Sequence, residues 1–389
     1  MLFDLTFSQL MAVLAFVLAA FVVYVLTPLM GALARRMGAV SVPLDERRMH
    51  VDAMPMLGGL GMYLAVVITV VLVAPWGDTV KAVIVGGSAI TAVGLIDDYV
   101  QIRPLVKFLG QLAAIGGALA FNVRMESVSL PFVGAQVALP LWVSLIVTIL
   151  WMAAIINMVN FIDGLDGLAA GVCAISALTF GLIAFSLYRV DTAIVSFALA
   201  GATLAFLRFN FHPAVIFMGD AGAMFLGFVL AVISLQGVLK TSATVALIVP
   251  LLVLAVPFFD LFLIVLRRLW RRVPFYRPGQ DHVHHELVLV AGFSQRKSVL
   301  LLYGWCLLLN GAAVCMSQDW YVAAAVLGGL AAVATLFLVL LLVRTRRRNR
   351  NGLSGADAVT IDGDAAATTR SATGGDAAAA ETGVEPADR

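Results

Sequence analysis

Two adjacent carboxylates followed by a lysine are the first residues in this sequence whose spacing suits chemistry. Asp97 and Asp98 end an apolar run that starts near residue 80, and Lys107 stands near the start of the next run. Because like charges separate the pKa values of neighbouring acids, one carboxylate can bind a metal ion while the other takes a proton. Taken alone, the pair also fits a solvated helix end.

A second cluster places four oxygen-bearing side chains within ten residues. Its members are Asn157, Asn160, Asp163 and Asp166. Such oxygens suit a hard cation or the polar edge of a nucleotide, and the interspersed Gly164 and Gly167 let the backbone approach a ligand. We expect a binding site here in preference to a simple turn between helices.

An aspartate flanked by glycines marks a third cluster, at the mouth of an apolar run. Asp220 follows Gly219 and precedes Gly222, and can hold a metal ion. Phe217 can stack on a nucleobase, although core packing is the commoner role of a single phenylalanine.

Histidines and arginines gather in a long loop between about residues 267 and 297. His282, His284 and His285 stand within four residues, with arginines nearby. These cationic and hydrogen-bonding side chains suit phosphate oxygens. A basic loop resting on anionic lipid would explain the arginines but not the histidines.

The elements that must position these clusters are membrane-spanning helices. The chain has 389 residues, 62% hydrophobic and 12% charged, whereas soluble domains carry about 25% charged residues. Apolar runs of roughly 20 residues predict an all-α polytopic fold with about eleven transmembrane helices. The runs lie near 7–30, 57–75, 80–96, 105–122, 140–157, 167–188, 192–208, 221–237, 243–266, 299–317 and 320–343.

The sequence outside these runs predicts the domain organisation. Residues 1–345 form one membrane domain, and 346–389 form a basic juxtamembrane segment with a disordered tail from about Asn351, rich in Ala, Thr, Gly and Asp. The first run is long and has no basic segment before it, so we expect it to be retained and not cleaved as a signal peptide. Weak alternation over 123–139 predicts a small hairpin.

Lysine and arginine divide unevenly between alternate loops and so predict the orientation. One set of loops holds nearly all of them, and the other holds only Lys81, Arg124, Arg189 and Lys240. Basic loops stay in the cytoplasm, which places the N-terminus outside and the C-terminus inside. All four clusters then lie on the cytoplasmic face, where ionisable groups at membrane depth indicate function.

Together the clusters favour phosphoryl transfer between a charged soluble donor and a lipid acceptor, because they supply acids for a divalent cation and a basic loop for phosphates. In their order along the chain they resemble the polyprenyl-phosphate N-acetylhexosamine-1-phosphate transferases, glycosyltransferase family 4. The resemblance covers about residues 45–300 and includes His50 with Pro55-x-x-Gly58-Gly59, His212-Pro213 and Phe217-Met218-Gly219-Asp220.

The resemblance implies a role for each cluster. The catalytic residues would be Asp97, Asp98, Lys107, His282, His284 and His285. The nucleotide-binding residues would be Asn157, Asp163, Asp166 and Phe217. Magnesium, or manganese in its place, would be held by Asp220 with help from Asn160.

The histidine motif, His-x-His-His followed by Gly292-Phe-Ser294, resembles one branch of the family. That branch transfers N-acetylglucosamine-1-phosphate from UDP-N-acetylglucosamine to undecaprenyl or decaprenyl phosphate, releasing UMP, and would start cell-wall or surface polysaccharide synthesis at the bacterial plasma membrane. The resemblance allows a homodimer and implies no nucleic-acid partner. The alternative within the family acts on muramoyl-pentapeptide and has a His-His-His run, which this chain lacks.

A cation-coupled secondary transporter is the alternative from another class, since buried acids also mark transport pathways. It predicts acids near the bilayer midplane and an internal repeat, and the sequence favours neither. An intramembrane metalloprotease needs His-Glu-x-x-His, but Glu286 is followed by Leu287, Val288 and Leu289.

Overall fold

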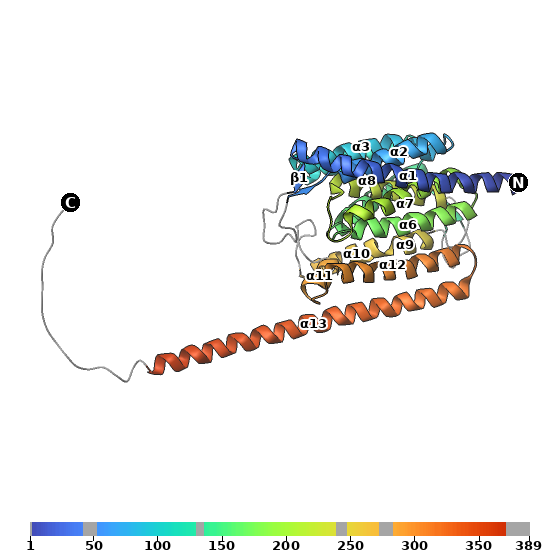
Figure 1. Cartoon of the computed structure of the whole chain (residues 1–389). Coiled ribbons are helices and arrows are strands. Elements are labelled where there is room, and N and C mark those ends of the chain that lie inside the picture. Colours follow the sequence, from blue (N-terminus) through green and yellow to red (C-terminus); the bar gives the residue numbers. More distant parts are fainter. Residues whose placement is uncertain (1, 42–52, 130–135, 239–246, 272–282, 371–389) are drawn as a thin grey trace, which may run out of the picture. The chain divides into compact units, whose positions relative to one another are not determined.

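The computed structural model describes residues 2–41, 53–129, 136–238, 247–271 and 283–370. Its helices are α1 (Leu2–Met37), α2 (Gly58–Val73), α3 (Asp78–Val100), α4 (Pro104–Leu119), α5 (Leu141–Ile162), α6 (Leu168–Ser186), α7 (Val190–Asn210), α8 (Gly219–Ile233), the π-helix η1 (Ser234–Val238), α9 (Ile248–Val253), α10 (Ala255–Arg271), α11 (Val283–Leu289), α12 (Gln295–Ser317) and α13 (Tyr321–Arg370). These residues fall into two units, divided between Leu338 and Val339. In the first unit the long helices run side by side (Figure 1).

Two short antiparallel sheets complete the described fold. One pairs β1 (Val40–Ser41) with β2 (Met54–Pro55), and the other pairs β3 (Ser127–Ser129) with β4 (Gln136–Ala138). The second pair confirms the small hairpin that the alternating sequence predicts.

Every predicted apolar run coincides with an apolar helix of the described chain. Eight of these helices are long and apolar enough to cross a membrane. Three shorter ones, Gly58–Val73, Pro104–Leu119 and Ala255–Leu266, stand where the sequence predicts further spans. An all-α polytopic membrane protein is therefore confirmed.

The run near 243–266 forms two helices, and a proline explains the break between them. Pro257 has no N–H to donate to the carbonyl of Val253, where α9 ends. That carbonyl instead accepts from Ser176 Oγ of α6 at 3.0 Å and from Asn310 Nδ2 of α12 at 3.2 Å. Side chains of neighbouring helices thus satisfy a backbone group that the bilayer could not.

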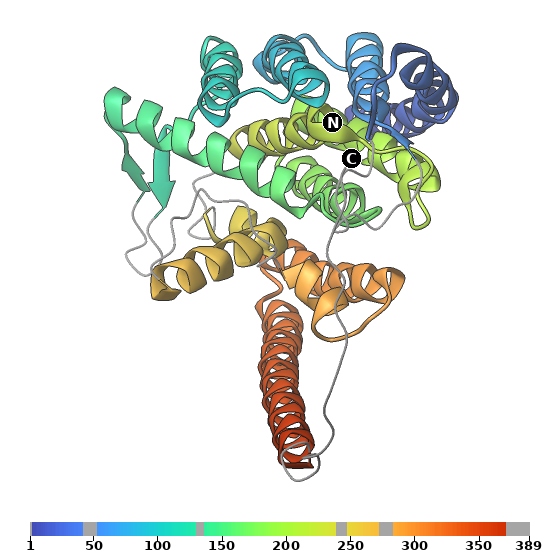
Figure 2. The same cartoon turned by 90° about the vertical axis from the view of Figure 1, so that its left-hand side faces the viewer.

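Helix α8 forms the centre of the first unit. All its residues from Ala221 to Ile233 are buried, and it packs against α3 on one side and α5 on another. Figure 2, which views the helices from the end at which β1 lies, shows the yellow-green α8 below the row that α2, α3 and α4 form at the top. A helix surrounded in this way must be apolar all round, and a charged residue on it is confined to its ends.

The tail differs from the prediction, because α13 continues to Arg370 where disorder was expected from about Asn351. Alanine has the highest helix propensity, and extending an existing helix needs no new nucleation. A composition poor in large apolar residues predicts that 351–370 build no apolar core, but it does not exclude a single continuing helix. Residues 371–389 lie outside the described part of the chain.

Candidate active site

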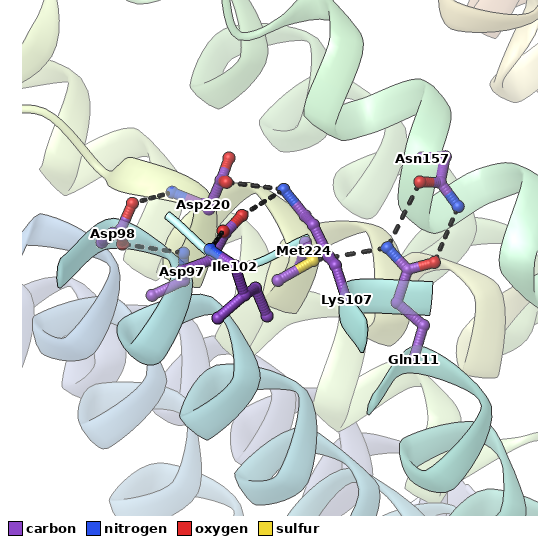
Figure 3. A network of polar contacts seen from close by, with 9 residues as sticks. Asp97, Asp98, Ile102, Lys107, Gln111, Asn157, Asp220 and Met224 are labelled. Carbon is purple, nitrogen blue, oxygen red and sulfur yellow. Dashed lines mark hydrogen bonds and ion pairs between the residues drawn. The ribbon is translucent and has the colours of Figure 1, made fainter. Parts of the chain in front are cut away.

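Lys107 lies between two carboxylates that come from different helices. Its Nζ is 2.8 Å from Asp97 Oδ2 and 2.5 Å from Asp220 Oδ2 (Figure 3). Asp97 stands in the last turn of α3, Lys107 in the first turn of α4, and Asp220 is the second residue of α8. Three helix ends therefore place one positive and two negative side chains around a single point.

Asn160, in the last turn of α5, joins this group. With its side-chain amide turned to satisfy both neighbours, Nδ2 donates to Asp220 Oδ1 over 2.9 Å and the oxygen accepts from Lys107 Nζ over 3.3 Å. The four residues Asp97, Lys107, Asn160 and Asp220 are called the ion cluster below. They lie far apart in the sequence and meet only because four helices end at the same level.

Asp98 has different partners from its neighbour and caps α8. Its Oδ1 accepts from the backbone N–H of Asp220 at 2.7 Å, and its Oδ2 accepts from that of Ala221 at 3.1 Å. A carboxylate stabilises a helix N-terminus by accepting N–H groups that have no partner within the helix. The approach depends on Gly94, where a Cβ would collide with the backbone of Ala221.

Asp163 follows α5 and lies outside the membrane-spanning helices. Its side chain keeps some exposed surface, but protein atoms surround most of it. Burial, and next the negative charges of Asp220, Asp98 and Asp166, raise the pKa of Asp163 to about 7. Asp163 therefore changes charge near neutral pH, as residues of active sites commonly do.

Gly164 brings the histidine helix α11 beside this turn. A Cβ at residue 164 would collide with His284 Nε2 and lie 3.2 Å from His285 Nε2. The two histidine rings are neighbours, with centroids 4.4 Å apart. The structure thus brings together two clusters separated by more than a hundred residues, although His282 lies outside the described residues.

Two further carboxylates fasten loops around the site. Asp166 Oδ2 pairs with His212 Nδ1 at 2.9 Å and accepts from the backbone N–H of Ala214 at 3.1 Å. Asp260 Oδ1, on α10, accepts from the N–H of Val283 at 2.7 Å, where α11 begins. The expected nucleotide contact of Asp166 stays a prediction, while its hold on the loop before α8 is visible.

Phe217 is half-buried, and the segment before α2 fixes its backbone. Its N–H donates to Pro55 O at 2.9 Å, and its carbonyl accepts from Gly58 N–H at 3.0 Å. Any side chain at Gly59 would collide with Gly222 of α8. The Pro55-x-x-Gly58-Gly59 motif therefore has a packing role: it lets the start of α2 touch the loop that carries Phe217.

Asn157 pairs with Gln111 of α4, a residue that sequence reasoning missed. Asn157 Nδ2 donates to Gln111 Oε1 at 2.8 Å, and Gln111 Nε2 donates back to Asn157 Oδ1 at 3.2 Å. Gln111 is 1% exposed. Its signal in the sequence is a lone amide in an apolar run, four residues after Lys107.

Magnesium suits the ion cluster by ligand type. Within the described residues no three histidine, cysteine, aspartate or glutamate side chains converge as a metal site. Magnesium does not need three, because it keeps several waters and takes one or two carboxylates together with substrate phosphates. Asp97 and Asp220 already bind one cation between them, the ammonium of Lys107. The negative charge of these residues therefore fits a site for a second cation such as magnesium.

The fold and the site define a polytopic membrane protein with a charged cluster where several of its helices end. Residues 80–238 match the family model described as glycosyl transferase family 4. This match begins two residues inside α3, ends with η1 and includes every residue of the ion cluster.

Curated relatives give the same assignment. A probable undecaprenyl-phosphate N-acetylglucosaminyl 1-phosphate transferase of Bacillus subtilis is 37% identical over 292 residues, which are 75% of this chain and 81% of the relative. The decaprenyl-phosphate N-acetylglucosaminephosphotransferase of Mycobacterium tuberculosis is 36% identical over 355 residues, 83% of this chain and 87% of the relative. The phospho-N-acetylmuramoyl-pentapeptide-transferase of Listeria monocytogenes is 41% identical over only 155 residues, 37% of this chain and 48% of the relative.

The chain therefore belongs to the polyprenyl-phosphate N-acetylhexosamine-1-phosphate transferases of glycosyl transferase family 4.

Proposed function

We propose that this protein transfers N-acetylglucosamine-1-phosphate from UDP-N-acetylglucosamine to undecaprenyl or decaprenyl phosphate and releases UMP. The observation that carries the proposal is the ion cluster, in which Lys107 lies between Asp97 and Asp220 where membrane helices end. A lipid phosphate can reach such a position from the bilayer and a nucleotide can reach it from water. The relatives that match most of the chain bear names for this transfer.

The net reaction exchanges one phosphoanhydride bond for another. An oxygen of the lipid phosphate bonds to the sugar-proximal phosphorus of the donor, the bond from that phosphorus to the bridging oxygen breaks, and UMP leaves with the electron pair. Such a transfer is catalysed mainly by positioning and by neutralising charge. Lys107 supplies a fixed positive charge, and His284 and His285 supply further donors beside the Asp163 turn.

The two adjacent aspartates take different roles in this proposal. Both oxygens of Asp98 accept backbone N–H groups of α8, so Asp98 orients Asp220. Asp97 is held by Lys107 and by the N–H of Ile102 at 2.9 Å, and it is the acid we assign to the lipid phosphate and its proton. Magnesium, or manganese, would be held by Asp220 with Asn160 and would neutralise the donor diphosphate.

We place the site on the cytoplasmic face of a bacterial plasma membrane. Arg35 and Arg36 end α1, next to β1 and at the same end as α11 (Figure 1). The positive-inside rule assigns that end to the cytoplasm, where UDP-sugars are made. A transporter would instead carry its acids near the middle of its helices, whereas here Asp97, Asp163 and Asp220 stand at or next to helix ends.

Release of UMP by purified protein tests the proposal. The protein in detergent is incubated with magnesium, undecaprenyl phosphate and either UDP-N-acetylglucosamine or UDP-muramoyl-pentapeptide. We expect UMP only from the first donor, and none when a chelator is present. If only the pentapeptide donor yields UMP, the reaction class stands but the proposed sugar donor is wrong. If a folded preparation releases no UMP from either donor, the transferase proposal is wrong.

A further inference from the structure

A second polar layer lies one helical turn beneath the ion cluster. On α4, Gln111 stands four residues after Lys107; on α8, Met224 stands four residues after Asp220; on α5, Asn157 stands three residues before Asn160. One turn of an α-helix is about 5.4 Å. Three helices thus contribute one residue each to the ion cluster and one each to this deeper group, called the amide layer below (Figure 3).

The members of the amide layer satisfy one another. Gln111 and Asn157 exchange two hydrogen bonds, at 2.8 Å and 3.2 Å. Gln111 Nε2 also lies 3.4 Å from Met224 Sδ, and Asn157 Nδ2 donates to the carbonyl of Ala153 at 2.8 Å. The pair therefore joins α4 to α5 and touches α8, the same three helices that carry Lys107, Asn160 and Asp220.

An amide pair between two membrane helices needs a reason when one of its members, Gln111, is buried and the other, Asn157, is half-buried. Gln111 is 1% exposed, and polar side chains at this depth are expensive unless they are paired. Leucine would fill the same space at lower cost. What an amide pair adds is a fixed geometry, since two reciprocal hydrogen bonds set the distance and the rotation between α4 and α5.

Lys107 has particular need of a fixed helix. It stands in the first turn of α4, where helices fray, and it has a long, flexible side chain. Its ammonium must nevertheless meet Asp97 and Asp220 at the ends of two other helices. A displacement of about 1 Å at a catalytic group can lower a rate about 100-fold.

We infer that Gln111 and Asn157 form a positioning pair that holds Lys107 in the ion cluster, and that Asn157 serves the reaction through this pair and not as a nucleotide ligand. The inference rests on the proposed transferase function. It adds Gln111 to the residues that the reaction needs and changes the role that family resemblance implies for Asn157.

The test compares steady-state UMP release by Gln111→Leu, by Asn157→Leu and by a double variant in which Gln111→Asn and Asn157→Gln exchange the two amides. Loss of the pair should lower kcat about 10- to 100-fold in both leucine variants, with KM for UDP-N-acetylglucosamine within about 2-fold of wild type. The exchanged pair keeps both amides and the total side-chain length, so it should restore kcat to within about 5-fold. Gln236→Leu is the control, because Gln236 is also buried but donates to Asn122 O in another part of the fold, at 3.3 Å.

If Asn157 bound the nucleotide instead, the variants would behave differently. Asn157→Leu would raise KM for the donor, Gln111→Leu would leave KM unchanged, and exchanging the two amides would not restore kcat. Either this KM pattern or the failure to restore kcat overturns the inference. If the leucine variants do not fold, kcat is compared between the single variant Gln111→Asn and the double variant that also carries Asn157→Gln. A higher kcat in the double variant supports the pair, and an equal or lower kcat refutes it. Absence of UMP from wild type would instead count against the transferase function itself.

Discussion

Replacing Lys107 by methionine should destabilise the protein because it leaves two carboxylates facing each other. Asp97 Oδ2 and Asp220 Oδ2 lie 2.8 Å and 2.5 Å from the same nitrogen, so the two oxygens are at most about 5 Å apart. With an effective dielectric constant of about 20, two unit charges at that distance repel by about 3 kcal/mol. Fully buried ion pairs lose roughly 3–5 kcal/mol when one partner is removed. Because Lys107 is 17% and Asp220 33% exposed, the loss here should lie at the lower end of that range.

The loss should be visible as a lower midpoint of thermal unfolding. An unfolding entropy of about 2 cal/mol/K per residue over a chain of this size converts 3 kcal/mol into about 4 °C. The midpoint is measured by intrinsic fluorescence in detergent with a chelator present. Adding magnesium should raise the midpoint of Lys107→Met more than that of wild type, because a divalent cation can replace the missing ammonium between the two acids.

Two variants serve as controls for the charge. Lys107→Arg keeps a positive charge and should lose less stability, while Lys81→Met removes a lysine that forms no ion pair within the described chain. Lys107→Met should also release no UMP. An unfolding midpoint equal to wild type in chelator would refute the electrostatic reasoning, and so would an equal loss in Lys81→Met.

Three other results are expected. Burial raises the pKa of Asp163 to about 7 from an ordinary value of 3.8, so the unfolded chain ionises this acid at a lower pH than the folded chain. The protein therefore loses stability as the pH rises from about 4 to about 7. In thermal unfolding, Asp163→Asn should be more stable than wild type at pH 8 and equal to it near pH 4. Gly164→Ala should displace His284 and lower UMP release at least about 10-fold, whereas Gly304→Ala, with open space around residue 304, should not; equal activities would contradict the packing argument. Asp98→Ala should lower the free energy of unfolding by about 1–2 kcal/mol through the lost cap on α8, and Asp98→Asn, which keeps an acceptor oxygen, by less; chemical denaturation in mixed micelles distinguishes the two.

Most of the helical architecture could be predicted from the sequence. Apolar runs above the length of a bilayer crossing are a strong signal, because the bilayer forces the backbone to satisfy its own hydrogen bonds within each helix. The break between α9 and α10 was not predicted, since its stability depends on Ser176 and Asn310 reaching the freed carbonyl of Val253 from other helices. The continuation of α13 was missed because composition measures the lack of an apolar core and not the ease of extending a helix.

The site was predicted as a set of clusters, but the partners within it were not. Asp97 and Asp98 are indistinguishable in the sequence as adjacent acids. Their different partners follow from the helical rotation of about 100° between neighbouring residues, which directs one toward Lys107 and the other toward the start of α8. Gln111 was overlooked because a single amide in an apolar run has no chemical pattern around it.

The sequence by itself determined that this is a multi-pass membrane protein of the polyprenyl-phosphate transferase family, because hydropathy and short motifs with fixed order are local properties of the chain. Only the tertiary structure decided which polar residues share a site and which hold it together. Lys107, Asp220 and Asn160 meet because the ends of α4, α8 and α5 stand at one level. Close packing of α8 against α3 at Gly94 and against α5 at Gly227, together with the hydrogen bonds that join Gln111 of α4 to Asn157 of α5, holds these helices against one another. Such contacts between helices distant in the chain leave no periodic trace in the sequence.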